Sequence, residues 1–428
     1  MEQLAIDVGA VLSAPRLYEI AASVEAIDAT RGLEPSQRLP EVHGAPHALG
    51  QAFAGLVLVL VGQGSVGMLL TLWAAQVGVR AVVAVDRALV KPTSLLTHPV
   101  GPDEIGAPKA RVAGRRAKAL HPRTRVYAFE GDFEELPVHV LANASCILLA
   151  SDNLLCEVAV AQRALHLGVP VLQGSVHGGT LSAQVRSVYG GEDGSGPSLC
   201  CGFGPAEWAH LDAGSVFSCA GDGAGRARPA GAPTMSPPYL CSMAASATLL
   251  ELTRRVTGLV PFESSAMVGY SGYGSAIHTA RLERRDSCPI DHQRFARAAP
   301  DPRLAERTPR ELLRAADAAG ADLRRVTFRV EAQRFASHLA CGCDLHPDLG
   351  RFLPRGTGKG SRGLAPCGRC GQPLAPHPLH VHEEVPAILL APHLDDTLAA
   401  LGVRPPTSVC LRTDARTTLF ASPFPEEP

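Results

Sequence analysis

The sequence predicts an α/β protein built around a doubly wound, Rossmann-like parallel sheet. Between residues 56 and 175, short apolar runs typical of buried strands alternate with longer helical patterns. The first run, LVLVLVGQGSVG (56–67), ends in glycines spaced G-x-G-x-x-G, and the second run ends in the carboxylate Asp86. A glycine turn that joins a strand to a helix is typical of a nucleotide-binding sheet.

The predicted elements follow one another along the chain. Residues 1–50 are expected to form an N-terminal helical segment, because apolar residues of EIAASVEAIDA (19–29) recur at helical spacing. Buried strands are expected at 56–62, 81–86, 125–129, 145–151 and 169–175, and helices between them at 65–79, 107–120 and 153–168.

The amino-acid composition of the chain changes near residue 190, where glycine, proline and alanine become frequent. Residues 51–290 are assigned to one nucleotide-binding domain, which includes a loop at 219–238 and a helix rich in small residues after it. Residues 291–428 are assigned to a C-terminal domain that is helical and arginine-rich at 295–325 and contains short strands afterwards.

Composition excludes several classes of protein. The formal net charge of −1 provides no basic field, so nucleic acid is not an expected partner. No apolar stretch approaches the roughly 18 residues that a membrane span requires. The first residues, MEQLAIDVGA, carry two acidic side chains where an export signal carries positive charge, so we expect a cytoplasmic protein. Twelve cysteines then indicate metal ligands or reactive thiols.

The glycine turn predicts a phosphate-binding site. Gly62, Gly64 and Gly67 allow a tight turn and a close approach of the backbone, and the helix that opens at Ser65 offers free amide groups to an anion. Asp86, at the end of the next strand, suits the hydroxyls of a ribose. These features alone fit a nicotinamide dehydrogenase equally well.

Two further residues favour an ATP site. Lys109 stands at the start of a predicted helix in a chain with only four lysines among its 40 basic residues, and Asp152 follows a buried strand. An ammonium and a carboxylate at one sheet edge suit a triphosphate and its magnesium ion, which hydride transfer does not need. The alternatives are that Lys109 is a solvated surface charge and that Asp152 only caps a helix.

The motifs GQGSVG, VVAVD, EIGAPKA, SDN and GVPVLQGSVHGGTLSAQV occur in the order typical of ThiF/MoeB-type adenylyltransferases and ubiquitin-activating enzymes. The chain resembles this family over about residues 55–290. The resemblance implies ATP-dependent adenylation of the C-terminal carboxylate of a ubiquitin-like protein. It also implies nucleotide-binding roles for Gly62, Gly64, Ser65, Gly67, Asp86 and Lys109, with magnesium held by Asp152.

The chain departs from the family at its phosphate-binding arginines. Ser94 and Thr97 stand where the family usually has asparagine and arginine, and Cys156 and Glu157 stand where a later arginine is usual. One cation is therefore unaccounted for. Arg111 or the N-terminal segment of a partner subunit are the expected sources, and the second option predicts a homodimer.

The resemblance also implies a thioester-forming cysteine. In relatives that form a thioester, the nucleophile lies at the start of a loop that crosses over the nucleotide, and Cys219 in FSCAG (217–221) has that place. Cys200, Cys201 and Cys241 are rival candidates. A structural or metal-binding role for Cys219 remains open.

Zinc is expected in the C-terminal domain. Cys341, Cys343, Cys367 and Cys370 form two pairs flanked by glycines, which suits a closed tetrahedral site of four thiolates that stabilises the fold. The zinc that related enzymes bind through two CxxC pairs is expected to be lost, because SLCCGF (198–203) and SCPIDH (287–292) preserve neither pair. A weaker set, Cys200 or Cys201 with Cys288 and His292, is the alternative.

These features predict an enzyme that adenylates a ubiquitin-like protein with ATP and Mg²⁺, transfers it to Cys219 and hands it to a conjugating enzyme. Arginine, alanine, glycine and proline usage resembles that of bacterial proteins. The added C-terminal domain resembles activating enzymes of bacterial ubiquitin-like conjugation operons, some of them antiviral (antiphage). Two alternatives remain: a carrier-protein adenylyltransferase for sulfur transfer in cofactor biosynthesis, and a non-catalytic scaffold that binds a ubiquitin-like protein.

Overall fold

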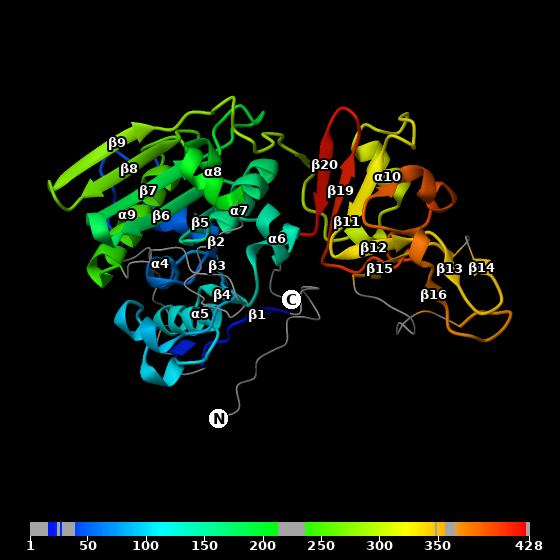
Figure 1. The fold of residues 1–428 in the computed structure, drawn as a ribbon, viewed down its shortest axis with the longest axis horizontal. Coiled ribbons are helices and arrows are strands. Elements are labelled where there is room, and N and C mark those ends of the chain that lie inside the picture. Colours follow the sequence, from blue (N-terminus) through cyan, green and yellow to red (C-terminus); the bar gives the residue numbers. More distant parts are fainter. Residues whose placement is uncertain are drawn as a thin grey trace. The chain divides into compact units, whose positions relative to one another are not determined.

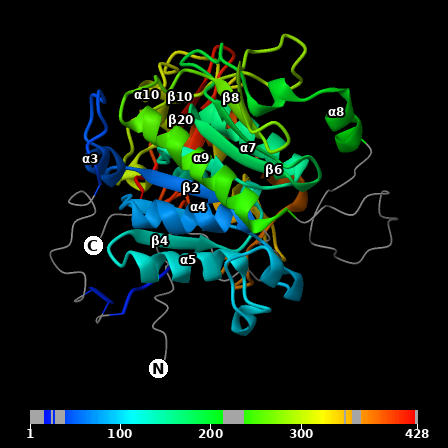
Figure 2. The ribbon, with the colours of Figure 1, turned by 90° about the vertical axis from the view of Figure 1, so that its left-hand side faces the viewer.

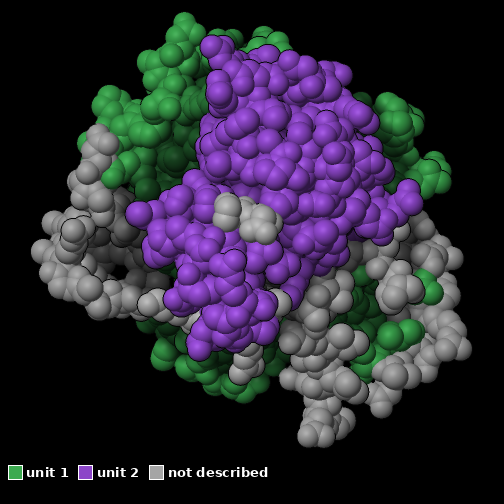
Figure 3. Space-filling model, turned by 90° about the vertical axis from the view of Figure 1, so that its right-hand side faces the viewer, with its two compact units in different colours: residues 1–10, 14–136, 143–294 green, residues 11–13, 137–142, 295–428 purple. Residues whose placement is uncertain are grey.

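The computed structural model describes most of the chain. The residues it describes are 16–23, 26–27, 39–212, 236–346, 349–355, 364 and 366–424. They form two compact units (Figure 3). Apart from the gaps just given, unit 1 takes residues 16–136 and 143–294, and unit 2 takes residues 137–142 and 295–424.

Unit 1 is built on one nine-stranded sheet with the strand order β1-β4-β3-β2-β5-β6-β7-β8-β9 (Figure 1). Its five central strands are parallel, whereas β1 and β7 to β9 run antiparallel to their neighbours. The strands are β1 Leu17–Glu19, β2 Val57–Val61, β3 Ala81–Val85, β4 Arg125–Phe129, β5 Cys146–Leu149, β6 Val171–His177, β7 Ser182–Val188, β8 Ala266–Ser271 and β9 Ala276–Arg281.

Helices follow the parallel strands and bury the sheet. They are α3 Leu49–Ala54, α4 Ser65–Gln76, α5 Lys109–Leu120, α7 Leu154–Leu167, α8 Pro205–Asp212 and α9 Pro238–Val256. α4 packs between α5 and α9 (Figure 2), and α9 also packs against β6 and β7. Every residue of β2, β3 and β5 is buried, as expected for parallel strands covered on both faces. The predicted doubly wound α/β fold is confirmed.

The N-terminal helical prediction is wrong for the residues that the structure describes before 24. Leu17–Glu19 form strand β1, which pairs antiparallel with β4 and places Leu17 opposite Phe129. Leu17 is only 1% exposed, so pairing with the sheet edge buries an apolar side chain that a helix in solvent would leave exposed. Most of the remaining predicted segment lies outside the described residues.

The described residues of unit 2 downstream of residue 295 form three small sheets and one short α-helix. The sheet orders are β10-β20-β19-β11-β18, β15-β12-β17 and β14-β13-β16. The elements are β10 Ala296–Arg297, α10 Pro309–Ala315, β11 Thr327–Val330, β12 Gln333–Ala336, β13 Leu339–Ala340, β14 Leu345–His346, β15 Arg351–Pro354, β16 Ala375–Pro376, β17 Val381–His382, β18 Val385–Pro386, β19 Ser408–Arg412 and β20 Thr417–Ala421. The predicted helical region at 295–325 is thus reduced mainly to α10, which is capped by Thr308.

A short helix from the middle of the chain belongs to unit 2. This helix, α6 (Val138–Ala142), follows β4 in sequence and docks on the carboxylate of Glu331. Glu331 accepts hydrogen bonds from the backbone amide of Val138, from His139 Nδ1 at 3.4 Å and from Ser408 Oγ at 2.9 Å. Burial alone would raise the pKa of Glu331, but these hydrogen bonds outweigh burial and lower it.

Among the described residues, no helix combines the length and the apolar character needed to cross a bilayer.

Replacing Glu331 should therefore destabilise unit 2. We expect Glu331→Ala to lower the free energy of unfolding by about 3 kcal/mol at pH 7, because it leaves His139 and the α6 amide without their buried acceptor. The pKa of Glu331 is lowered by folding, so its contribution is present at neutral pH and is lost as the pH falls through that pKa. Urea unfolding at several pH values measures both effects.

The matched control is Glu383→Ala. Glu383 forms an exposed ion pair with Arg355 at 3.2 Å, and such pairs contribute about 1 kcal/mol or less. Equal destabilisation by the two variants would contradict the role given to Glu331.

Candidate functional site

Unit 1 contains a cavity of about 630 Å³ at the carboxyl ends of its parallel strands. Ligands of open α/β sheets bind at this edge, because the loops that follow neighbouring strands meet there. The lining includes six of the seven residues predicted to bind the nucleotide and its magnesium, namely Gly62, Gly64, Ser65, Asp86, Lys109 and Asp152. Gly67, the seventh, lies behind the turn.

The three glycines of the turn meet different constraints. Gly62 has φ of +85°, and a Cβ atom there would lie 2.9 Å from the carbonyl oxygen of Ala150. A Cβ atom on Gly67 would lie 1.7 Å from the carbonyl oxygen of Gly62, so this glycine lets α4 pack against the turn. A Cβ atom on Gly64 would meet nothing within 4 Å and would project into open space, which leaves room for a phosphate at the start of α4.

Asp86 is held rigidly between two backbone amides. Its Oδ2 accepts a hydrogen bond from the amide of Gln63 and its Oδ1 from the amide of Ala88, both at 2.7 Å. Burial raises the pKa of Asp86, and these amides and the Lys109 ammonium oppose that effect. Each oxygen keeps acceptor capacity for a hydroxyl group, so the carboxylate fits the ribose role that the resemblance implies.

Lys109 is the first residue of α5 and lines the cavity. It is partly buried, and its Nζ lies 3.2 Å from Nε2 of His98. The alternative of a fully solvated surface lysine therefore does not hold.

Asp152 lies in the loop after β5 and also lines the cavity. The helix cap is the next residue, because Asn153 Oδ1 accepts hydrogen bonds from the amides of Leu155 and Cys156 at 2.9 and 3.4 Å. Asp152 is thus not the N-cap of α7, and that alternative is wrong. Its negative charge is a minor contribution to the raised pKa of Asp86, after burial, and both carboxylates line the cavity.

Arg111, one expected source of the missing cation, is committed elsewhere. Its guanidinium binds the Glu130 carboxylate at 2.5 Å and stacks on Tyr18, and it is not part of the cavity lining. Glu157, at a position where the family has arginine, is buried and pairs with Arg186 on β7 at 2.9 Å. In this arrangement the guanidinium groups of Arg111 and Arg186 are both engaged by carboxylates and are not available to a phosphate.

His98 is a cavity residue that the sequence reasoning missed. Its Nδ1 lies 2.9 Å from Thr97 Oγ1 and 3.5 Å from Ser65 Oγ, and its Nε2 faces Lys109. Burial, together with the Lys109 charge, lowers the pKa of His98 to about 4. The available signal was its position directly after Thr97, inside the segment that departs from the family pattern.

The predicted nucleophile Cys219 lies outside the described residues. Two of its rivals are shielded from bulk solvent, since Cys200 and Cys241 are each 1% exposed, and burial raises the pKa of both thiols. Cys241 nevertheless lines the cavity. A nucleophile needs its thiolate form, which burial disfavours in both residues, and access to the acyl group, which Cys200 lacks because it does not line the cavity.

The third rival, Cys201, belongs to a group of metal-type donors in unit 1. Its Sγ lies 3.5 Å from Nε2 of His292, and the donor atoms of Cys201, Cys288 and His292 all lie within 4.8 Å of one another. His292 Nδ1 lies 3.1 Å from the carbonyl oxygen of Gly196, which orients the ring for ligation through Nε2. The structure thus brings together the weaker set in the region where zinc was expected to be lost.

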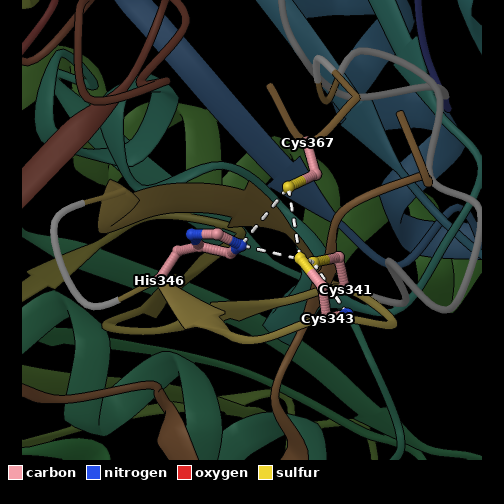
Figure 4. Close-up of side chains that lie close together, drawn as sticks. All are labelled: Cys341, Cys343, His346 and Cys367. Atoms are coloured by element: carbon pink, nitrogen blue, oxygen red, sulfur yellow. Dashed lines mark hydrogen bonds between the residues drawn. The ribbon is translucent and has the colours of Figure 1, made fainter. Parts of the chain in front are cut away.

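The C-terminal cysteines converge as a metal site requires (Figure 4). The structure groups Cys341, Cys343 and Cys367 with His346, whose Nε2 lies 3.3 Å from Cys341 Sγ. The fourth predicted ligand, Cys370, has its Sγ 3.6 Å from that of Cys341. Five donors therefore surround a site that a tetrahedral zinc ion would fill with four. His346 was missed: the histidines considered near this site were those of HPLHVHEE (377–384), which were interpreted as strand surface.

Comparisons with known proteins decide the family. The profile of the ThiF family matches residues 50–290, more than half of the sequence. This chain belongs to the ThiF family. The predicted resemblance to ThiF/MoeB-type adenylyltransferases is confirmed.

Other matches are more distant. Over 125 residues the chain is 35% identical to a sulfur carrier protein adenylyltransferase of Thermus thermophilus, which covers 28% of this chain and 45% of that protein. The chain thus spans less than half the length of this curated relative. Among solved structures, E. coli MccB with ATP has a TM-score of 0.44 at 14% identity, covering 56% of this chain and 68% of MccB. PaaA has a TM-score of 0.39 at 17% identity, covering 62% of this chain and 76% of PaaA.

The C-terminal donors generate a prediction about metal content. We expect the double variant Cys341→Ser/Cys367→Ser to lose about one equivalent of zinc per chain and to destabilise unit 2, because metal binding to such a site is coupled to folding. Elemental analysis of the purified protein gives the metal content. Cys410→Ser, a half-buried cysteine of β19 outside the donor group, is the control and should retain all metal. Equal zinc in both variants would refute the site.

Proposed function

We propose that this protein is an adenylyltransferase that uses ATP and Mg²⁺ to activate the C-terminal carboxylate of a ubiquitin-like protein. The observation that carries the proposal is the presence of Lys109 and Asp152 in one cavity beside the glycine turn. A dehydrogenase cofactor site has no need of this pair, whereas a triphosphate needs both a cation and a carboxylate-bound metal.

Each residue of the cavity has a part in this reaction. The Gly62–Gly64 turn and the amides of α4 hold phosphate oxygens, and Asp86 accepts hydrogen bonds from the ribose. Asp152 holds the magnesium ion, which supplies neutralising charge on the phosphates when it is bound. The carboxylate oxygen attacks the α-phosphorus, the bond to the β-phosphate oxygen breaks, and pyrophosphate leaves with the bonding electrons. Lys109 stabilises the negative charge on the transferring phosphate.

The proposal continues with a thioester on Cys219. The Cys219 thiolate attacks the acyl carbon of the adenylate, AMP leaves, and the ubiquitin-like protein passes to the cysteine of a conjugating enzyme. Support for Cys219 comes from its place in the sequence, from the burial of Cys200 and Cys241, and from the metal-type contacts of Cys201.

The assembly and the setting belong to the same proposal. A homodimer is proposed because a partner's N-terminal segment is a source for the cation that Arg111 does not provide. The proposed setting is a bacterial ubiquitin-like conjugation system, with antiviral defence as its role.

Sulfur transfer to a carrier protein is the second candidate. The 35% identity with the Thermus thermophilus sulfur carrier protein adenylyltransferase favours it. This alternative shares the adenylation step but needs neither a thioester on Cys219 nor a conjugating enzyme, so the two candidates differ in their requirement for that cysteine.

Adenylation itself is tested by ATP–pyrophosphate exchange with candidate carrier proteins. We expect Lys109→Met and Asp152→Asn each to lower the exchange rate at least 100-fold, because each removes a charge that stabilises the transferring phosphate. Lys118→Met is the matched control, since Lys118 lies at the other end of α5 and binds the carbonyl oxygen of Thr124 at 2.9 Å. Undiminished exchange in the Lys109 and Asp152 variants would refute the proposal, and a wild-type protein that binds the carrier without exchange would be a scaffold.

The thioester step has a separate readout. We expect Cys219→Ala to keep full pyrophosphate exchange and to lose a DTT-sensitive adduct with the carrier, because adenylation does not use the thiol. Non-reducing gel electrophoresis detects the adduct, and Cys410→Ala should retain it. An adduct that persists in Cys219→Ala would assign the nucleophile to another cysteine, whereas its absence from the wild type would favour the sulfur-transfer candidate.

A further inference from the structure

We propose that His98 is the second cation of the phosphate site, which becomes protonated as the triphosphate binds and supplies the positive charge that Thr97 does not. This inference rests on the proposed ATP-dependent function and extends it, because it names a source of the missing charge within this chain. It is an alternative to the partner's N-terminal segment as the source of that cation.

The cavity has few basic side chains in its described lining. Among the described residues that line it, the basic side chains are those of Arg87, His98, Lys109 and His177. Arg87 is paired with Asp132 at 3.2 Å, and His177 Nδ1 accepts the amide of Thr180 at 3.2 Å. Of these basic side chains, His98 is the one whose contact with Lys109 the described structure shows, and we therefore consider it as the source of the second positive charge.

His98 lies close to both the start of α4 and Lys109. His98 Nδ1 lies 3.5 Å from Oγ of Ser65, the first residue of α4, and that residue directly follows Gly64, where the turn leaves open space. His98 Nε2 lies 3.2 Å from the Lys109 ammonium. The imidazole thus lies between the helix terminus and the lysine, the two groups best suited to bind phosphate oxygens.

The contacts of the His98 imidazole indicate its protonation state in the absence of a ligand. The Lys109 ammonium can donate a hydrogen bond but cannot accept one. The 3.2 Å contact therefore requires His98 Nε2 to accept the hydrogen bond, and the ring is neutral with its proton on Nδ1. Burial, with a further contribution from Lys109, lowers the pKa of His98 to about 4, consistent with this state. Thr97 Oγ1, at 2.9 Å from Nδ1, can accept that proton.

A bound triphosphate would change the charges around His98. The groups in contact with His98 are the cation Lys109 on α5 and the hydroxyls of Ser65 and Thr97. The carboxylates Asp86 and Asp152 line the same cavity. A triphosphate draws the Lys109 ammonium toward itself and adds several negative charges near Nε2. Both changes favour the imidazolium form, so a proton is taken up from solvent on binding.

Linkage gives the sign of the pH dependence. Because the complex binds one more proton than the free protein, ATP affinity must fall as the pH rises through the raised pKa of His98 in the complex. A permanently charged arginine at the same place would give no such dependence.

The test is isothermal titration calorimetry of the full-length protein with a magnesium complex of non-hydrolysable ATP, without carrier protein. Titrations in buffers of different ionisation enthalpy report the protons taken up. We expect net uptake in the wild type, none in His98→Gln, and an affinity about tenfold lower in His98→Gln at pH 6.5 with a smaller difference at pH 8.5. His98→Arg should restore affinity without proton uptake, which a merely structural role for His98 would not produce.

His177→Gln is the matched control, because it removes the other histidine of the cavity lining and should leave proton uptake unchanged. Wild-type binding without proton uptake, or uptake that persists in His98→Gln, overturns this inference alone and leaves the adenylation proposal to be judged by pyrophosphate exchange. A protein that does not bind the ATP analogue at all refutes both.

Discussion

The meeting of opposite charges at one edge of the parallel sheet is the constraint on which the candidate site depends. Lys109, Asp86 and Asp152 come from segments far apart in the sequence, yet each lies directly after a strand or at the start of a helix beside the glycine turn. Only parallel pairing of β2, β3 and β5 brings these segments together, because it places the carboxyl ends of the strands side by side. The described lining of this cavity contains basic side chains, among them Lys109 and Arg87, together with the carboxylates of Asp86, Asp132, Asp152 and Glu157.

The central sheet could be predicted from sequence because its strands are buried on both faces. Runs such as VLVLV (57–61) carry the whole signal locally. The outer strands carry no such signal: five of the six residues of β9 are exposed, and β1 contains only three residues. Their conformation depends on hydrogen bonds to a neighbouring strand, which local periodicity does not encode.

The same distinction applies to the site. The glycine spacing, the rare Lys109 and the carboxylate Asp152 are local signals, and all were predicted. The engagement of Arg111 by Glu130, the capping of α7 by Asn153 and the approach of His346 to Cys341 depend on which side chains meet after folding. Sequence alone therefore predicted residues that line one cavity, but it did not predict which side chains are engaged by others after folding.

The proposed use of the ionisable His98 in place of a permanently charged arginine has a physical rationale in the ligand-free protein. Two permanent cations a few ångströms apart repel each other, and in a partly buried cavity water screens that repulsion weakly. Here Arg111 pairs with Glu130 and Arg186 pairs with Glu157. The pKa of His98, beside Lys109, is lowered to about 4, which favours the neutral imidazole. Under this proposal, positive charge develops on His98 only when phosphate is present to stabilise it. The empty cavity then avoids the repulsion, and the occupied cavity has the neutralisation that phosphoryl transfer requires.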